Sequence, residues 1–235
     1  MLLRIFSVVA MIGVASSSPV WASCERVTEK ILQLDASLQS KLAEFESLPS
    51  DPLNKSWVKA KIHFMVEIDQ DIRMAMLNWP ASENYSEEER QCFLKEIAGR
   101  MERVDIRNTS DLTQLMKIYN WFKQSDFGAE TSHEAWLIAQ HADRNPDFQR
   151  QVLKLMKDLW PIKEVAARDY AYLLDRVTWY ADKHPQIYAT QGRCVNRGNW
   201  QPWETEDFKH VDERRALMGM ETFLEYKKRV DAYCK

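Results

Sequence analysis

The chain has 235 residues, 29% of them charged, and a formal net charge of −3 at pH 7. This length is enough for one domain, or one domain with an extension, and for a substantial hydrophobic core. It has no basic stripe or basic tail, so the composition argues against nucleic acid as a partner.

The first 22 residues have the pattern of a secretory signal peptide. A single charge, Arg4, precedes an apolar run over residues 5–15 that is too short to span a bilayer. Val20 and Ala22 suit the −3 and −1 positions of a signal-peptidase site. We therefore expect cleavage after Ala22 and a periplasmic or secreted mature protein.

Two alternatives for the leader stay open. It could remain as an uncleaved membrane anchor. The residues Ala22-Ser23-Cys24 also resemble the end of a lipobox, which would give a lipid anchor at Cys24. After the leader no segment is long and apolar enough to cross a membrane, so we expect no transmembrane segment in the mature chain.

Four cysteines follow the leader: Cys24, Cys92, Cys194 and Cys234. An even number in an exported protein indicates two disulfides, for which three pairings exist. If the first three helices run up, down and up, Cys24 and Cys92 both lie near the starts of parallel helices. We therefore expect the pairs Cys24–Cys92 and Cys194–Cys234. Cysteine and histidine spacing fits no zinc site, so we expect no metal and no cofactor.

Apolar residues recur at helical spacing through the first half of the chain. They predict two helices, one from about residue 27 that is ended by Pro49 and one over about residues 54–79 that is ended by Pro80. A third helix begins at a capping box formed by Ser86 and Glu89. The acidic run at 87–89 suits the positive end of that helix, and we interpret it as a helix start rather than a cation site.

The second half of the chain predicts shorter helices. We expect Ser110 to cap a helix that starts there, and we interpret Asp105 with Asn108 as caps of the same helix rather than as ligands. Asn145, followed by a proline, is the cap of another helix. Further helices are expected over about 132–142, 163–182 and 211–233, the last with a potential break near Gly219.

The helical period fails between the last two of these helices, where glycines alternate with β-formers. This pattern predicts a short β-hairpin near residues 186–202. The fold class is therefore mostly α: an irregular helical bundle with one short β-hairpin.

Several segments after residue 104 resemble one bacterial family. They are VDIRNT at 104–109, AWLIAQHAD at 135–143, AYLLDRV at 171–177, YATQ at 188–191, VDERRA at 211–216 and LEY at 224–226. In this order they resemble the domain of unknown function 6624, whose hallmarks are QHAD, YLYDRV-like, YGTQ and VDxRR segments. The chain departs at Ala189, where the family usually has glycine. The resemblance implies a fold and a site but no reaction.

The resemblance also suggests how the chain is organised. It covers about residues 104–230. We therefore expect a signal peptide at 1–22, an N-terminal helical extension at 23–103 and a family-like helical domain at 104–235.

Polar residues within these segments form the candidate site. His141 would act as a general base, with Asp143 or Asp175 orienting its ring. Gln191 and Arg214 would bind a substrate oxygen. The candidate catalytic residues are His141, Asp143 and Asp175, and the candidate ligand-binding residues are Gln140, His141, Asp175, Gln191 and Arg214.

A structural interpretation of the same residues stays open. His141 and Gln140 would then hydrogen-bond backbone groups, and Asp143 would cap the next helix. Asp175 would pair with one of the arginines at 214–215. Buried polar groups need partners, so networks of this kind are common in purely structural roles.

Tryptophans provide a second set of candidates. Aromatic faces stack on sugars, so a glycan groove is conceivable in the envelope. Trp200 and Trp203 lie in the irregular segment and are the better binding candidates. Others fall on or beside apolar stripes and are expected in the core: Trp57, Trp79, Trp136 and Trp160.

These observations favour a binding or interaction protein with a polar pocket around His141, Asp175 and Gln191. Its partner would be an unknown small molecule, a glycan or an envelope protein. The alternative is a metal-independent hydrolase with His141 as general base, so whether the protein is an enzyme stays open. The chain contains no HExxH, no GxSxG and no phosphate-binding glycine loop.

Overall fold

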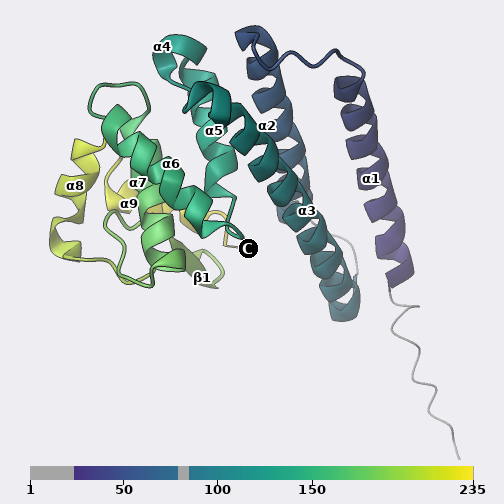
Figure 1. Cartoon of the computed structure of the whole chain (residues 1–235). Coiled ribbons are helices and arrows are strands. Elements are labelled where there is room, and N and C mark those ends of the chain that lie inside the picture. Colours follow the sequence, from purple (N-terminus) through teal and green to yellow (C-terminus); the bar gives the residue numbers. More distant parts are fainter. Residues whose placement is uncertain (1–23, 79–84, 235) are drawn as a thin grey trace, which may run out of the picture.

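The computed structural model describes residues 24–78 and 85–234, and it confirms the mostly helical fold class (Figure 1). The predicted signal peptide and Trp79 lie outside the described residues. Three long helices come first: α1 (Glu25–Glu46), α2 (Lys55–Leu77) and α3 (Glu87–Tyr119). Shorter elements follow: α4 (Gln124–Phe127), α5 (Ala129–Gln140), α6 (Pro146–Leu159), α7 (Ala167–Arg176), a π-helical turn (Val177–Ala181), β1 (Gly192–Asn196), β2 (Asn199–Pro202), a 3-10 turn (Phe208–His210), α8 (Val211–Leu217) and α9 (Phe223–Asp231).

Figure 1 shows the long helices α1, α2 and α3 on one side and the shorter elements on the other. Helix α5 joins the two groups, since it packs against α2 and α3 as well as α6 and α7. The turn between α5 and α6 therefore lies beside the long helices. That turn carries the QHAD segment of the candidate site.

Side-chain caps explain where several of the helices start. The Ser86–Glu89 capping box is present, and Asn54 and Asn145 accept hydrogen bonds from the first turns of α2 and α6. Gly219, with a φ of 64°, follows the end of α8. The break predicted near this glycine is confirmed, because a left-handed residue cannot continue an α-helix.

The predicted helix start at Ser110 is wrong, because α3 continues unbroken through this region. The hydroxyl of Thr109 donates to the carbonyl of Asp105, and that of Thr113 donates to the carbonyl of Thr109, both at 2.7 Å. In these bonds each threonine hydroxyl finds its partner on the helix's own backbone, four residues earlier. Asp105 and Asn108 therefore cap nothing. The domain boundary expected between residues 103 and 104 falls inside α3.

The helix expected over 163–182 is also different from the prediction. It begins at Ala167, after a turn in which Lys163 has a φ of 61°. From Val177 it changes to a π-helical turn that ends at Ala181.

The buried apolar side chains form two main clusters. The first lies among α1, α2 and α3 and contains Val27, Ile31, Leu38, Phe64, Ile68, Ile72, Phe93 and Ile97. The second is larger and extends from α2 and α3 to α7, with Ile62, Leu112, Trp136, Val152 and Leu173 among its members. Trp57 and Trp160 pack against the second cluster, as expected for core residues. Helices α2 and α3 contribute to both clusters.

The predicted β-hairpin is confirmed: β1 pairs antiparallel with β2, with Cys194 opposite Trp200. Disulfides join Cys24 to Cys92 and Cys194 to Cys234, which are the expected pairs. A sulfur held in a disulfide cannot also carry a thioether, which argues against the lipid anchor at Cys24. No helix in the described part of the chain is both long enough and apolar enough to cross a bilayer.

Candidate functional site

His141 lies at the C-terminal end of α5, and α2 supplies the carboxylate that orients its ring. Nδ1 of His141 is 3.0 Å from both carboxylate oxygens of Asp69. The His141 side chain is 13% exposed and that of Asp69 is 1% exposed. Neither Asp143 nor Asp175, the orienting residues suggested by the sequence, hydrogen-bonds this ring.

Burial sets the protonation state of His141. It lowers the pKa of the imidazole below the ordinary value, and the charges of Arg73 and Arg176 lower it further. The Asp69 carboxylate opposes this fall without cancelling it. The ring is therefore neutral at pH 7, with Nδ1–H donated to Asp69 and Nε2 left as an acceptor. The side-chain nitrogen of Gln140 lies 3.4 Å from Nε2.

Arg73 links this pair to a second carboxylate. Its Nε donates to Asp69 at 3.0 Å, and its Nη2 donates to Asp105 of α3 at 2.6 Å. Burial raises the pKa of Asp105 to about 6, despite the charge of Arg73, and the negative charges of Asp69 and Asp143 add to that rise.

Asp69, Asp105 and His141 also form a set that could hold a metal ion. Each offers one ligand atom, and these atoms lie within 4.8 Å of one another. Imidazole and carboxylate suit a divalent transition metal. Arg73 bridges the two carboxylates, so a metal ion would compete with its guanidinium for the same oxygens. The expectation of no metal stays a prediction.

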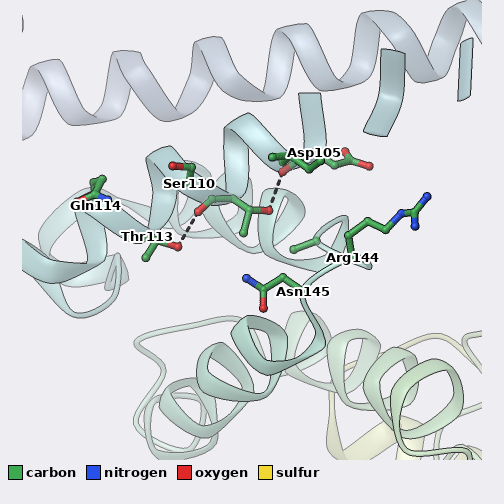
Figure 2. Close-up of a pocket in the computed structure, with 9 residues that line it drawn as sticks. Asp105, Ser110, Thr113, Gln114, Arg144 and Asn145 are labelled. Atoms are coloured by element: carbon green, nitrogen blue, oxygen red, sulfur yellow. Dashed lines mark hydrogen bonds between the residues drawn. The ribbon is translucent and has the colours of Figure 1, made fainter. Parts of the chain in front are cut away.

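Asp105 lines a pocket of about 410 Å³ between α3 and the turn from α5 to α6 (Figure 2). We call it the Asp105 pocket; its lining residues are Asp105, Ile106, Thr109, Ser110, Thr113, Gln114, Ala142, Arg144 and Asn145. Figure 2 shows Asp105 and Gln114 at opposite ends of the α3 wall, with Asn145 across from it. His141 is the neighbour of Ala142 in sequence but is not part of this lining.

Asp143 belongs to a second cluster, centred on Arg176. The guanidinium of Arg176 donates to both oxygens of Asp143, at 2.7 and 2.5 Å, and Gln149 donates to one of them at 3.2 Å. Burial would raise the pKa of Asp143, but Arg176 outweighs it and the pKa falls. The next helix is capped by Asn145 instead. Arg176 also reaches Gln191 at 3.4 Å.

Asp175 holds a loop together. It is fully buried and accepts hydrogen bonds from three backbone N–H groups, those of Ile187, Tyr188 and Thr190, and from the Thr190 hydroxyl. Through Thr190 and Gln191 it connects to Arg176. Every one of these partners lies in the segment that ends at Gln191, so the carboxylate fixes that segment.

The arginines of the VDERR segment hold the same loop from the other side. Arg214 donates to the carbonyl of Ile187 at 3.0 Å, and the buried Arg215 donates to that of Tyr188 at 2.7 Å. Neither arginine pairs with Asp175, so the ion pair of the structural interpretation is absent among the contacts of these three residues. All the hydrogen bonds of the Arg214 side chain go to backbone carbonyls. Ala189 has a φ of 55°, in the region that favours the glycine usual in the family.

The two tryptophans of the irregular segment have different surroundings. Trp200 is buried against Tyr226, with ring centroids 5.5 Å apart, so it does not offer the binding face we expected. Trp203 stacks on Trp179 at 5.3 Å, and the guanidinium of Arg193 lies 4.9 Å from its ring centroid.

Sequence reasoning missed Asp69 and Arg73. They lie four residues apart on α2 and pair with each other. Each directly follows a buried isoleucine, Ile68 or Ile72. An oppositely charged i,i+4 pair beside an apolar stripe is the signal that could have identified them, but pairs on the protein surface show the same spacing in a sequence.

A family model matches residues 58–235, and it describes a family of unknown function (DUF6624). The match begins in α2, so it includes Asp69 and Arg73 as well as the segments after residue 104. Searches of curated proteins and of solved structures found no match. Because the model covers most of the sequence, the chain belongs to this family of unknown function, DUF6624.

Proposed function

We propose that the protein is an exported binding protein that takes a small polar ligand in the Asp105 pocket. One observation carries the proposal. Asp105 lines a pocket of about 410 Å³ and is joined through Arg73 to the buried Asp69–His141 pair. Ligand pockets combine such a recess with a few placed polar groups and titratable residues of perturbed pKa.

The proposed site is centred away from Asp175 and Arg214. All the hydrogen bonds of these two side chains go to the loop and turn that they hold. Gln191 stays next to the site through its contact with Arg176. The proposed ligand site therefore lies on α3 and the α5–α6 turn, with His141 and Gln140 behind it.

Export to the periplasm or beyond is part of the proposal. The leader pattern of residues 1–22 supports it. Two disulfides support it as well, because disulfides persist in oxidising compartments and are rare in the cytosol.

A metal-independent hydrolase with His141 as general base is the second candidate. It is favoured by the Asp69 hydrogen bond at 3.0 Å, which orients the ring and leaves Nε2 as the acceptor. General acid–base catalysis of this kind contributes about 10²–10⁴-fold in rate. Both cysteine pairs are disulfides, so the second candidate relies on an activated water rather than a thiolate.

Native mass spectrometry of the protein purified from the periplasm tests the binding function. We expect a small molecule to copurify with the wild type and to be lost from Asp105→Asn. The matched control is Glu102→Gln, because Glu102 lies one turn earlier on α3 and pairs with Arg144 at 3.0 Å. Equal retention by both variants, or no bound molecule in any sample, would count against the proposal. Turnover of that molecule that His141→Gln abolishes would favour the hydrolase.

A further inference from the structure

We propose that the Asp105 pocket recognises an amine: a ligand with an ammonium group at Asp105 and a hydrogen-bond acceptor at the Gln114 end. This inference rests on the proposed binding function and names its ligand class. It follows from which hydrogen-bonding groups of the lining are already used and which remain for a ligand.

The Asp105 end offers negative charge. Arg73 binds Oδ1 of Asp105 at 2.6 Å, and Oδ2 has no hydrogen-bond partner among the described residues. Arg73 is itself shared with Asp69, so one guanidinium serves two carboxylates. An ammonium group at Oδ2 would form a charge-assisted hydrogen bond, the stronger kind.

The wall beside Asp105 offers acceptors. The hydroxyl hydrogens of Thr109 and Thr113 are donated to carbonyls of α3. A hydroxyl whose hydrogen is used in this way has only its lone pairs left for a ligand. This part of the wall therefore favours N–H groups and disfavours carboxylates or phosphates.

The far end of the pocket has the opposite polarity. Oε1 of Gln114 accepts from Lys117 at 2.8 Å, and Oδ1 of Asn145 accepts from the backbone N–H of Phe148 at 3.1 Å. Each amide therefore has its NH₂ group left as a donor. These donors suit a carbonyl or hydroxyl oxygen of the ligand.

The charges of the lining disfavour an anionic ligand. Arg144 is the cationic residue among the lining residues, but Figure 2 shows its guanidinium directed away from Gln114 and Asn145. Its side chain is 71% exposed and pairs with Glu102. An anion would therefore meet Asp105 without a compensating cation inside the pocket.

The length of the α3 wall sets the size of the ligand. From Asp105 to Gln114 the helix rises about 13 Å, at about 1.5 Å per residue. Three bonds of an extended chain span about 3.3–3.6 Å, as in one residue of a polypeptide. The seven bonds from amine nitrogen to carbonyl oxygen across six carbon atoms therefore span about 8 Å, and a hydrogen bond of about 2.9 Å at each end covers most of the remaining distance.

Three probes separate the two ends of the pocket: 6-aminohexanamide, hexanamide, which lacks the amine, and hexylamine, which lacks the carbonyl. Binding is measured by NMR titration of the purified protein. We expect 6-aminohexanamide to bind most tightly and hexanamide at least tenfold more weakly. Asp105→Asn should weaken the binding of 6-aminohexanamide by about 10–100-fold, which is the effect of losing one hydrogen bond to a charged group. Glu102→Gln should leave the affinity unchanged.

A second variant allows the test to be made even if Asp105→Asn does not fold. Gln114→Leu removes a donor at the far end of the pocket. It should therefore weaken the binding of 6-aminohexanamide and leave the binding of hexylamine unchanged. Equal affinity for 6-aminohexanamide and hexanamide, or no effect of Asp105→Asn, would overturn the inference. A copurified ligand that is displaced by Asp105→Asn but contains no amine would overturn the ligand class and leave the binding function intact.

Discussion

Asp175 and Asp105 are both carboxylates largely removed from water, and their surroundings differ in one respect. Asp175 accepts hydrogen bonds through both oxygens, from three backbone N–H groups and one hydroxyl. Asp105 lines a pocket and uses one carboxylate oxygen for Arg73, while the other oxygen has no hydrogen-bond partner among the described residues. A buried acid whose acceptors are all used by its own chain fixes a loop, whereas one with a spare acceptor is available to a ligand.

The largest effect should come from removing the loop-fixing carboxylate. Asp175→Ala leaves three backbone N–H groups without acceptors, at about 1–3 kcal/mol each. We expect the free energy of unfolding to fall by about 3–5 kcal/mol in urea titrations. The control is Asp182→Ala, an exposed partner of Arg150, with an expected loss below about 1 kcal/mol. Equal losses would remove the distinction between the two carboxylates.

Replacing Asp69 with Asn should have the next largest effect. It takes one partner from a buried ion pair with Arg73, which costs about 3–4 kcal/mol of unfolding free energy. The pKa of His141 should fall further, since the Asp69 carboxylate raises it. The imidazole proton signals, titrated by NMR, report this pKa. The control is Asp71→Asn, on the same helix but paired with Lys41, which should leave the pKa of His141 unchanged. An unmoved pKa in Asp69→Asn would show that Asp69 does not act on this ring.

The smallest effect concerns the pH dependence of stability. The pKa of Asp105 is raised to about 6 in the folded protein, against about 3.9 in an unfolded chain. The folded state therefore favours the protonated form. The resulting stabilisation is complete below pH about 4 and is lost as the pH rises through about 6.

The comparison of wild type with Asp105→Asn isolates this carboxyl group, because other titrating groups, His141 and Asp143 among them, are present in both proteins. Between pH 4 and 7 the wild type should lose about 2–3 kcal/mol of unfolding free energy relative to the variant. Urea titrations at several pH values measure it. Parallel curves for the two proteins would mean that Asp105 titrates in the folded state as it does in the unfolded one.

The sequence predicted the features that depend on neighbouring residues. The Ser86–Glu89 capping box and the Asn145–Pro146 helix start are contained within a few residues, so their chemistry is visible in the sequence. The Cys24–Cys92 pair followed from an up-down-up order of helices, which places the starts of α1 and α3 together.

The residues whose roles were missed or wrongly predicted from the sequence have partners that lie far away in the chain. Asp69 and His141 are 72 residues apart, and no spacing rule joins them. Asp105 and Asn108 have the composition of a cap, yet their side chains bind distant groups instead: Asp105 accepts from Arg73, and Asn108 donates to the carbonyl of Met65. The cap interpretation placed Asp105 at a helix end, and the structure places it inside α3, where it lines a pocket.

The continuity of α3 has a mechanical consequence. This helix has 33 residues, so it is about 50 Å long, and with α2 it supplies side chains to both hydrophobic clusters. Asp105 lies between Ile97 of the first cluster and Leu112 of the second. The two clusters are therefore connected by two continuous helices, α2 and α3. Neither helix contains a hinge about which one cluster could rotate relative to the other. When a ligand binds at Asp105, we expect side chains and the α5–α6 turn to change conformation. The two clusters should keep their positions relative to one another.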